Sequence, residues 1–444
     1  MSYKNKQIAV LGFGSSGEAA ARLLAEEGAM ITILDSADLK MLRSKIEKMT
    51  PLGISVLAGI EADTDPRIYD RGILSPGIDP TVPLVQNFLR KRIEMIGELE
   101  FSWELCKCPV VAITGTNGKT TTTELVARML NECEIRTLAA GNIGPAFAGV
   151  VKKSAELDVM TLEVSSFQLE EIRTFRPHIA VWLNFTPDHL DRYPDMGSYR
   201  KAKLRIFEFQ TPEDFAVIKL EDMPAVIDPA SLRAQVITFS AVRQGGDFDL
   251  RDGVIHFRGE PVLTMSDAKL RGVHNAENLM AALGVGHLMG LGFDRMAAPL
   301  LEYTPQPHRC ERAGTVDGVD YVNDSKATNI DALEKALLSE TRPVVLIAGG
   351  KDKGFEFGAI TDLIACKVHH AVLIGEMAER IEALWQSRVP CERAESLADA
   401  VQRARSHARP GDVVLFSPGT SSFDMFKNYA DRGDQFRNLI QSLV

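Results

Sequence analysis

Residues 110–122 decide the fold, and they read VVAITGTNGKTTT. An apolar, β-branched run turns through two glycines into a threonine-rich helix start. In such a turn the backbone N–H groups and the helix dipole point at phosphate oxygens, Lys119 can reach the terminal phosphates, and the Thr120 hydroxyl can ligate Mg²⁺. The Gly-x-x-Gly-Lys-Thr spacing is two residues shorter than the usual P-loop, so the segment is a variant of that motif. It predicts ATP or GTP binding, against the alternative of a chance strand, turn and helix.

The rest of the chain alternates short β-branched runs with amphipathic stretches, and many of the runs end in Gly or Ser. This alternation is typical of βαβ units that build mostly parallel sheets. At roughly 150 residues per domain, 444 residues correspond to about three domains. We therefore predict an α/β protein with three domains: a Rossmann-like N-terminal domain over 1–98, a central P-loop ATPase-like domain over 99–304, and a Rossmann-like C-terminal domain over 305–444.

The expected elements can be placed along these three blocks. In the first block we expect strands at 7–11, 30–34 and 72–74 and a helix at 18–27. In the second and third blocks we expect strands at 110–114, 158–164, 179–184, 343–348, 371–374 and 412–416, helices at 119–131 and 272–291, and short strands and turns over 212–270.

Composition narrows the class of protein. Hydrophobic residues make up 45% and charged residues 25%, and the net charge is 50 − 60 = −10, which disfavours non-specific binding to nucleic acid. We expect no membrane-spanning helix, because no run of 18 apolar residues occurs, and no signal peptide at the N-terminus. Six scattered cysteines fit reduced core thiols, with Cys106 and Cys108 structural rather than zinc-binding. These features predict a cytoplasmic protein with neither nucleic-acid nor membrane partners.

A second glycine loop lies near the N-terminus. Residues 12–17 read GFGSSG, follow an expected strand and open an expected helix, and Asp35 ends the next strand. This pattern fits a dinucleotide site with Asp35 on a ribose, a site for a nucleotide-sugar diphosphate, or a Rossmann-like turn that binds nothing. The loop alone does not choose among the three.

Polar side chains follow two further strands of the central block. Glu163 ends one strand, where an acid that holds Mg²⁺ is needed beside a phosphate-binding loop. Beyond the next strand, His189 could ligate a metal, and Asp188 and Asp191 could bind water or cap a helix. The alternatives are a solvated strand end and ordinary hydrogen-bonded surface residues.

Several motifs in a fixed order resemble those of the Mur ligases. They are GTNGKTT at 115–121, LEVSSFQL at 162–169, NFTPDHLD at 184–191, HNAEN at 274–278, NDSKATN at 323–329 and SPGTSSFDMFKNY at 417–429. The match covers the whole chain. Within the family the motifs are most similar to those of the members that add D-glutamate.

The resemblance implies an activity and its reactants. It implies that the carboxylate of UDP-N-acetylmuramoyl-L-alanine (UDP-MurNAc-L-Ala) attacks the γ-phosphorus of ATP, and that the D-Glu amine then displaces phosphate from the acyl phosphate. It also implies ATP and two Mg²⁺ ions as cofactors, a carbamylated Lys203, a monomer, and a third domain that closes on the nucleotide.

The resemblance also implies a role for each matching residue. The catalytic residues would be Lys119, Glu163, His189 and Lys203, and the metal ligands Thr120, Glu163, His189 and Lys203. The ATP site would comprise Gly115, Thr116, Asn117, Gly118, Lys119, Thr120, Thr121, Asn275, Asn278, Arg309 and Asp324. The UDP-substrate site would comprise Ser15, Ser16, Asp35, Ser36, Gly77 and Asn142, and the D-glutamate site Thr328, Lys353, Ser422 and Phe423. Two departures stand out, since Lys351 rivals Lys353 and Tyr429 lies where the family pattern has Phe.

Three rival functions remain open from the sequence. The chain could add another amino acid within the same family, or extend folate with glutamate. It could be a nucleotide-dependent ATPase switch, which would hydrolyse ATP without an amino acid. It could be an NAD-dependent dehydrogenase built on residues 12–17, which would leave residues 110–122 unexplained.

Overall fold

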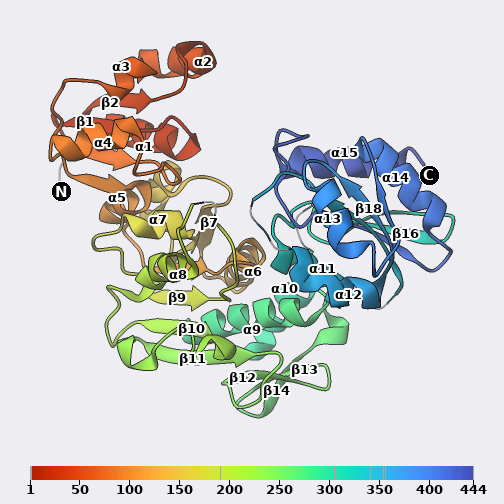
Figure 1. The fold of residues 1–444 in the computed structure, drawn as a ribbon. Helices are drawn as coiled ribbons and strands as arrows, with labels where there is room; N and C mark the ends of the chain where they lie inside the picture. The colour runs from red at the N-terminus through yellow and green to blue at the C-terminus, as the bar shows by residue number, and fades with distance from the viewer. Residues whose placement is uncertain are drawn as a thin grey trace. The chain divides into compact units, whose positions relative to one another are not determined.

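The computed structural model describes residues 3–190, 192–304, 307–340, 342–353, 355 and 357–443, so Asp191 lies outside the described residues. The chain divides into two compact units. The first unit comprises Met1–Phe185, Gly197–Thr264 and Glu277–Leu300, and the second comprises Thr186–Met196, Met265–Ala276 and Leu301–Val444. Over the described residues the strands form three sheets, coloured red to orange, orange to green, and teal to blue in Figure 1.

The N-terminal sheet is parallel throughout, with strand order β3-β2-β1-β4-β5. Its inner strand β1 is buried except at its first residue, as expected of a strand covered on both faces. The strands are β1 (Gln7–Leu11), β2 (Met30–Asp35), β3 (Ser55–Ala58), β4 (Arg71–Leu74) and β5 (Met95–Gly97). The helices are α1 (Ser15–Glu26), α2 (Leu39–Met49), α3 (Ile60–Asp63), α4 (Pro83–Arg90) and α5 (Glu98–Leu105), with a 3₁₀ turn η1 (Thr50–Leu52).

The central sheet has the order β14-β13-β12-β11-β10-β9-β6-β8-β7. Its pairs are parallel from β7 to β12, and β12, β13 and β14 form an antiparallel meander at one edge. The strands are β6 (Val110–Thr114), β7 (Thr137–Gly141), β8 (Val159–Glu163), β9 (Ile179–Trp182), β10 (Phe215–Lys219), β11 (Gln235–Ser240), β12 (Phe248–Arg251), β13 (Val254–Phe257) and β14 (Glu260–Thr264). The helices and 3₁₀ turns are α6 (Lys119–Glu132), η2 (Phe147–Gly149), η3 (Val151–Glu156), α7 (Ser166–Glu170), α8 (Met196–Leu204), η4 (Arg205–Phe207), η5 (Leu220–Asp222), η6 (Pro229–Ser231), η7 (Met265–Asp267), α9 (Val273–Leu288) and α10 (Phe293–Leu301).

The C-terminal sheet has the order β15-β16-β20-β17-β18-β19, and β15 pairs antiparallel with β16 while the other pairs are parallel. Along β17 alternate residues enter two hydrophobic clusters, so both faces of the sheet are covered. The strands are β15 (Glu311–Val316), β16 (Val319–Asn323), β17 (Val344–Gly349), β18 (Val368–Ile374), β19 (Cys391–Arg393) and β20 (Val413–Phe416). The helices are α11 (Ile330–Ser339), α12 (Thr361–Lys367), α13 (Ala378–Trp385), α14 (Leu397–His407) and α15 (Tyr429–Gln441), with η8 (Phe357–Ile360).

Comparison with the expected elements confirms the α/β class and shifts several boundaries. β1 and β6 have the expected bounds. α1 begins at Ser15 rather than at residue 18, because extended Gly14 (φ −72°, ψ −175°) ends the glycine loop as the N-cap. β9 ends at Trp182 rather than at 184. Six strands had not been expected from the sequence: β3, β5, β7, β15, β16 and β19.

The cysteines are reduced, as expected, but most of them do not lie in the core. All six are free thiols. Only Cys133 is buried, whereas Cys310 and Cys366 are exposed, so the expectation of core positions is wrong for these two. In addition, no helix among the described residues has the length and apolar character needed to cross a bilayer.

Candidate active site

The predicted phosphate-binding loop turns sharply between β6 and α6. Gly115 and Gly118 have φ angles of +154° and +82°. A Cβ on Gly118 would lie 2.5 Å from Asn278 Oδ1, and a Cβ on Gly115 would lie 2.9 Å from Leu183 Cβ. Both positions therefore require glycine, and the loop leads directly into the N-terminus of α6, where an anion is favoured.

Thr120 and Glu163 meet at the start of α6. β8 pairs with β6 so that Glu163 lies opposite Ile113, which brings its carboxylate to the loop. Thr120 Oγ1 donates a hydrogen bond to Glu163 Oε2 at 2.8 Å, and Asn142 Nδ2 donates to Oε1 at 2.7 Å. The hydroxyl and the buried carboxylate form an oxygen donor set of the kind that Mg²⁺ prefers.

Lys119 folds back over its own loop. Its ammonium donates to the carbonyl oxygens of Gly115 and Thr116, each at 2.8 Å. These carbonyls hold the positive charge beside the loop backbone, where phosphate oxygens would bind. Thr121 is buried in the same turn of α6.

Asn184 holds the loop from the segment that follows β9, a role that was not predicted. Its backbone oxygen accepts from the Thr116 N–H at 3.0 Å, and its side chain both accepts from the Asn117 N–H at 2.9 Å and donates to the Asn117 oxygen at 3.0 Å. Asn184 opens the NFTPDHLD motif. An amide at a strand end beside a phosphate-binding loop was the signal that could have identified it.

Lys203 is nearly fully buried beside the same loop, at 1% exposure. Its Nζ donates to the Gly115 oxygen at 2.9 Å and lies 4.9 Å from the centre of the Tyr199 ring. The Tyr199 hydroxyl in turn lies 3.2 Å from Thr116 Oγ1. Lys203 is therefore buried, although the basic sequence of its helix favours a surface position. It lies in the first unit, together with Thr120 and Glu163.

His189 belongs to the second unit and has a left-handed backbone, with φ +56°. Its Nε2 lies 3.7 Å from Asp188 Oδ2, which also accepts from Asn329 Nδ2 at 3.1 Å. Asp188 therefore orients both residues. The pairing of His189 with Lys203 in one metal site stays a prediction.

The two asparagines of α9 have different surroundings. Asn278 Oδ1 accepts from Thr122 Oγ1 at 3.2 Å, which ties α9 to α6 directly behind the loop. Asn275 lies in the second unit and donates from Nδ2 to the Arg271 oxygen at 2.7 Å. Their contacts with a base or ribose stay predictions.

The N-terminal glycine loop is stabilised by Asp35. Its Oδ2 accepts from the Phe13 N–H at 2.7 Å and its Oδ1 accepts from the Ala37 N–H at 2.8 Å. A Cβ on Gly17 would lie 1.9 Å from the Gly12 oxygen, so this helix start packs directly on the turn. Asp35, the last residue of β2, thus stabilises the loop backbone with both of its carboxylate oxygens.

A groove of about 440 Å³ runs along α1, where it faces η2 and η3. Ser15 lines it together with Lys153 and with two ion pairs, Arg22 with Glu18 at 2.9 Å and Lys152 with Glu26 at 2.8 Å. The structure includes the other residues predicted to bind the UDP-substrate, but they do not line this groove: Ser16, Asp35, Ser36, Gly77 and Asn142. Ser36 Oγ donates to Asp63 at 2.6 Å, and exposed Gly77 has φ +89°.

In the second unit, Asp324 ends a buried strand-to-turn segment. Its Oδ2 accepts from Ser417 Oγ at 2.7 Å and its Oδ1 from the Cys310 N–H at 3.2 Å. Burial raises the pKa of Asp324 to about 6, although these hydrogen bonds and the charge of Arg309 oppose the shift. Arg309, whose guanidinium lies near Asp324, was predicted together with it for the ATP site.

The predicted D-glutamate residues lie on three turns of the second unit. Lys353 is half-buried, with Nζ 5.6 Å from the centre of the Phe355 ring, whereas Lys351 is exposed and its backbone bridges to Ser421. Ser422 is buried, Thr328 is half-buried, and Phe423 is 67% exposed. Lys353 is thus the more buried of the two lysines, and its role in binding D-glutamate stays a prediction.

Arg432 is a buried cation that the sequence reasoning missed. It is fully buried at the start of α15 and donates to Ser325 Oγ at 3.0 Å, to the Ser325 oxygen at 2.8 Å and to the Thr420 oxygen at 3.2 Å. Burial lowers the pKa of Arg432 to about 9. Its Nη1 finds no acceptor among the described residues and lies 3.3 Å from the position of a Cβ on Gly350. The sequence signal that could have identified Arg432 is a single arginine on the apolar face of the helix.

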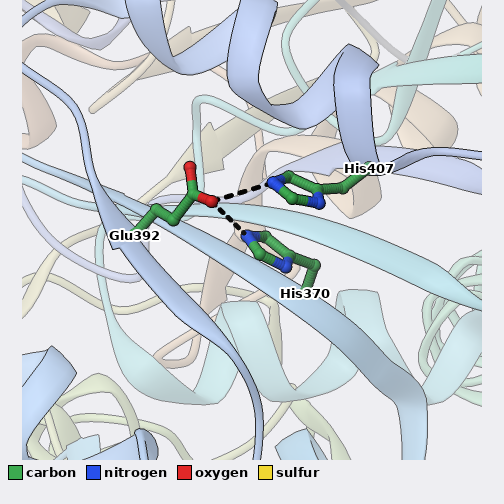
Figure 2. A group of neighbouring side chains, drawn as sticks. All are labelled: His370, Glu392 and His407. Carbon is green, nitrogen blue, oxygen red and sulfur yellow. Dashed lines mark hydrogen bonds and ion pairs between the residues drawn. The ribbon is translucent and has the colours of Figure 1, made fainter.

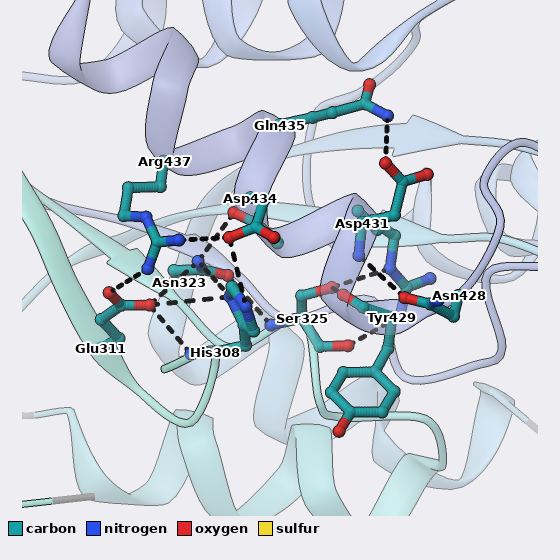
Figure 3. Close-up of polar contacts among 12 residues, drawn as sticks. His308, Glu311, Asn323, Ser325, Asn428, Tyr429, Asp431, Asp434, Gln435 and Arg437 are labelled. Carbon is teal, nitrogen blue, oxygen red and sulfur yellow. Dashed lines mark hydrogen bonds and ion pairs between the residues drawn. The ribbon is translucent and has the colours of Figure 1, made fainter. Parts of the chain in front are cut away.

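Figure 3 shows how the segment that carries Ser325 is fastened to α15. Asn323 Nδ2 lies 3.0 Å from His308 Nδ1 and donates to the Gly433 oxygen at 3.0 Å. Glu311 pairs with Arg437 at 3.0 Å, and Ser325 Oγ donates to the Tyr429 oxygen at 2.8 Å. Tyr429 also receives the Lys326 ammonium over its ring at 3.7 Å. These contacts fasten to α15 the segment that leads to Thr328, one of the residues predicted to bind D-glutamate.

The fold and this site define an α/β nucleotide-binding protein with a variant P-loop in the central sheet. The family profile described as the Mur ligase middle domain matches residues 113–286, and the one described as the Mur ligase, glutamate ligase domain matches residues 308–419. The chain belongs to the Mur ligase family.

Relatives agree with this assignment along the full length. The chain is 38% identical over 446 residues to UDP-N-acetylmuramoylalanine–D-glutamate ligase of Geobacter sp. (strain M21), covering 100% of this chain and 99% of the relative. It is 40% identical over 448 residues to the protein of the same name from Geotalea uraniireducens, with the same coverage. The crystal structure of UDP-N-acetylmuramate-alanine ligase from Thermotoga maritima has the same fold, with a TM-score of 0.64 at 18% identity over 99% of this chain and 100% of that chain.

Proposed function

We propose that this protein is an ATP-dependent ligase that joins D-glutamate to UDP-MurNAc-L-Ala, releasing ADP and phosphate, in the synthesis of peptidoglycan precursors. The observation that carries the proposal is the loop 115–121 with Thr120 hydrogen-bonded to Glu163 at 2.8 Å. This is a phosphoryl-transfer site. The names of full-length relatives at 38–40% identity support the choice of amino acid and acceptor.

In this proposal the loop residues act on the phosphates of ATP. The N–H groups at the start of α6 and the Lys119 ammonium bind phosphate oxygens and offset the charge that builds up as the substrate carboxylate attacks the γ-phosphorus. Thr120 and Glu163 would hold Mg²⁺, which when bound neutralises charge on the phosphates. Asn184 fixes the loop backbone, so that these groups keep their positions during the transfer.

Lys203 would carry a carbamate in the active protein. Its ammonium would lose one proton to solvent, the neutral amine would add to CO₂, and the adduct would lose a second proton, which converts a buried cation into an anion beside the loop. The 2.9 Å contact with the Gly115 oxygen and the burial of Lys203 support a site that shields such a group from water. The carbamate and His189 would then be the ligands of a second Mg²⁺.

The remaining assignments are proposals of the same kind. Ser15, Ser16, Asp35, Ser36, Gly77 and Asn142 would bind the UDP-sugar; Asn275, Asn278, Arg309 and Asp324 would complete the ATP site; and Thr328, Lys353, Ser422 and Phe423 would bind D-glutamate. We further propose the three-domain division at 98 and 304, a monomer, and a cytoplasmic protein. Closure of the C-terminal domain on the nucleotide predicts a smaller radius of gyration in X-ray scattering with all substrates than without them.

The test is phosphate release from ATP and Mg²⁺ with UDP-MurNAc-L-Ala and one of D-Glu, L-Glu or meso-diaminopimelate. We expect release only when the UDP-sugar and D-Glu are both present. Release with another amino acid would keep the reaction class and change the specificity. Release that needs no acceptor would favour the ATPase switch and refute the ligase.

A further inference from the structure

Three side chains that the proposed reaction does not use meet on one edge of the C-terminal sheet (Figure 2). His370 comes from β18, Glu392 from the edge strand β19, and His407 from the last turn of α14. Glu392 Oε1 lies 2.9 Å from His407 Nε2 and 3.6 Å from His370 Nε2. One ligand atom from each residue lies within 4.8 Å of those of the other two.

His370 points a buried and unsatisfied nitrogen into this cluster. The residue is only 7% exposed, and its Nε2 has no hydrogen-bond partner among the described residues. Leaving such an atom unsatisfied costs free energy, so a native structure needs a reason for it. A ligand that accepts a nitrogen lone pair and also contacts the carboxylate supplies that reason.

The two imidazole rings of the cluster lie face to face. The His370 and His407 rings stack with 3.5 Å between centroids and 12° between planes, so one ring must turn about its Cβ–Cγ bond before both nitrogens can face the same point beside Glu392.

Neighbouring residues fix the carboxylate, and a third histidine lies outside the cluster. Arg403 Nη1 lies 3.4 Å from Glu392 Oε2 and its Nε is held by Asp399 at 2.9 Å, so Oε1 is the oxygen presented to the two rings. His369, the neighbour of His370 on β18, pairs instead with Asp412 at 3.0 Å. His369 therefore serves as a matched control residue on the same strand.

We propose that His370, Glu392 and His407 bind a first-row transition-metal dication such as Zn²⁺. Two imidazole nitrogens and one carboxylate oxygen form a ligand set that zinc uses, with the fourth position left to water. With bonds of about 2.0–2.1 Å, tetrahedral ligands lie roughly 3.3 Å apart, and the distances from Oε1 to the two rings bracket that value. When a metal bonds to His407 Nε2, the proton on that atom moves to Nδ1 if the ring is neutral and is released to solvent if the ring is an imidazolium.

The bound metal would act as a structural clip. It joins β18, the three-residue edge strand β19 and the end of α14, which are otherwise linked at this point by hydrogen bonds and ion pairs. The inference does not depend on the ligase proposal, because none of the three residues has a role in that reaction. Loss of the metal should change the stability of the second unit and leave ligation intact.

The test is a titration of the full-length protein with Co²⁺ in excess Mg²⁺, followed by visible absorption and by the number of ions bound per chain. Excess Mg²⁺ occupies the proposed phosphate site, and Co²⁺ reports its ligands through d–d bands. We expect the wild-type chain to bind one more Co²⁺ than His407→Gln or Glu392→Gln, without thiolate charge-transfer bands that would signal cysteine ligands. His369→Asn should bind like the wild type.

A thermal melt provides a second readout that does not depend on the spectrum. Zn²⁺ should raise the melting temperature of the wild type and of His369→Asn, and leave that of His407→Gln unchanged, because a ligand that binds only the folded state stabilises it. His407 is about one-third exposed, so its replacement should leave the fold intact, with phosphate release as the check. Equal Co²⁺ binding by His407→Gln and wild type, or no Co²⁺ binding by the wild type, would overturn the proposal.

Discussion

At the scale of single residues, Thr120 is where the loop and the neighbouring strand meet. We expect Thr120→Val to lower phosphate release by about 100-fold or more, because it removes a proposed metal ligand and leaves Glu163 Oε2 without its donor at 2.8 Å. Steady-state phosphate release measures this loss. Thr123→Ser is the matched control, since Thr123 Oγ1 donates only to the Lys119 carbonyl of its own helix. Full activity of Thr120→Val would remove Thr120 from the metal site.

The two lysines after β17 offer a second comparison at this scale. Lys353→Met should raise the KM for D-Glu roughly 10- to 100-fold with a smaller change in the KM for ATP, because a charge-assisted hydrogen bond to a carboxylate contributes about 1.5–3 kcal/mol. Lys351→Met should leave both constants near the wild-type values, since Lys351 is exposed. The reverse result would assign the pocket to Lys351.

At the scale of elements, α15 depends on one glycine. A Cβ on Gly433 would lie 2.2 Å from His308 Nδ1, and both residues belong to the network of Figure 3 that fastens α15 to the segment before β15. We expect Gly433→Ala to destabilise the second unit by about 1–3 kcal/mol, as overpacking does. Chemical denaturation followed by fluorescence measures the change. Gly358→Ala is the control, because its Cβ would lie 3.7 Å from Leu384 Cδ2, an ordinary contact.

Some strands could be predicted from the sequence, and others could not. β1 and β6 were predicted at their true bounds because each is a β-branched run that ends at glycines. β15 and β16 were missed because their short, mixed sequences become strands only by pairing with each other and with β20. The position of Glu163 beside Thr120 followed from strand ends in a parallel sheet, whereas the burial of Lys203 and Arg432 depends on tertiary packing that no local pattern encodes.

At the scale of the whole molecule, buried carboxyls couple stability to pH. Glu98 starts α5 and its Oε1 accepts from the Ala148 N–H of η2 at 2.6 Å, so it links the end of the N-terminal sheet to the central one. Burial raises the pKa of Glu98 from 4.5 to about 7, although the hydrogen bonds from Ala148 and Ser102 oppose the shift. Oε2 has no hydrogen-bond partner among the described residues. The protonated carboxyl is therefore the form that the folded chain prefers.

This preference has a definite sign. Between pH 4.5 and 7 the folded state binds more protons than the unfolded state at Glu98, so the free energy of unfolding falls as the pH rises through this window, by up to about 3 kcal/mol for this group. Asp324, raised to about 6, adds a loss of the same sign between pH 4 and 6. Glu98→Gln imitates the protonated carboxyl and should remove the Glu98 contribution, so the variant should gain stability relative to the wild type as the pH rises from 5 to 8. Urea denaturation at several pH values, with the exposed Glu61→Gln as control, measures the difference. Parallel pH profiles for Glu98→Gln and the wild type would mean that Glu98 ionises in the folded protein as readily as in the unfolded chain.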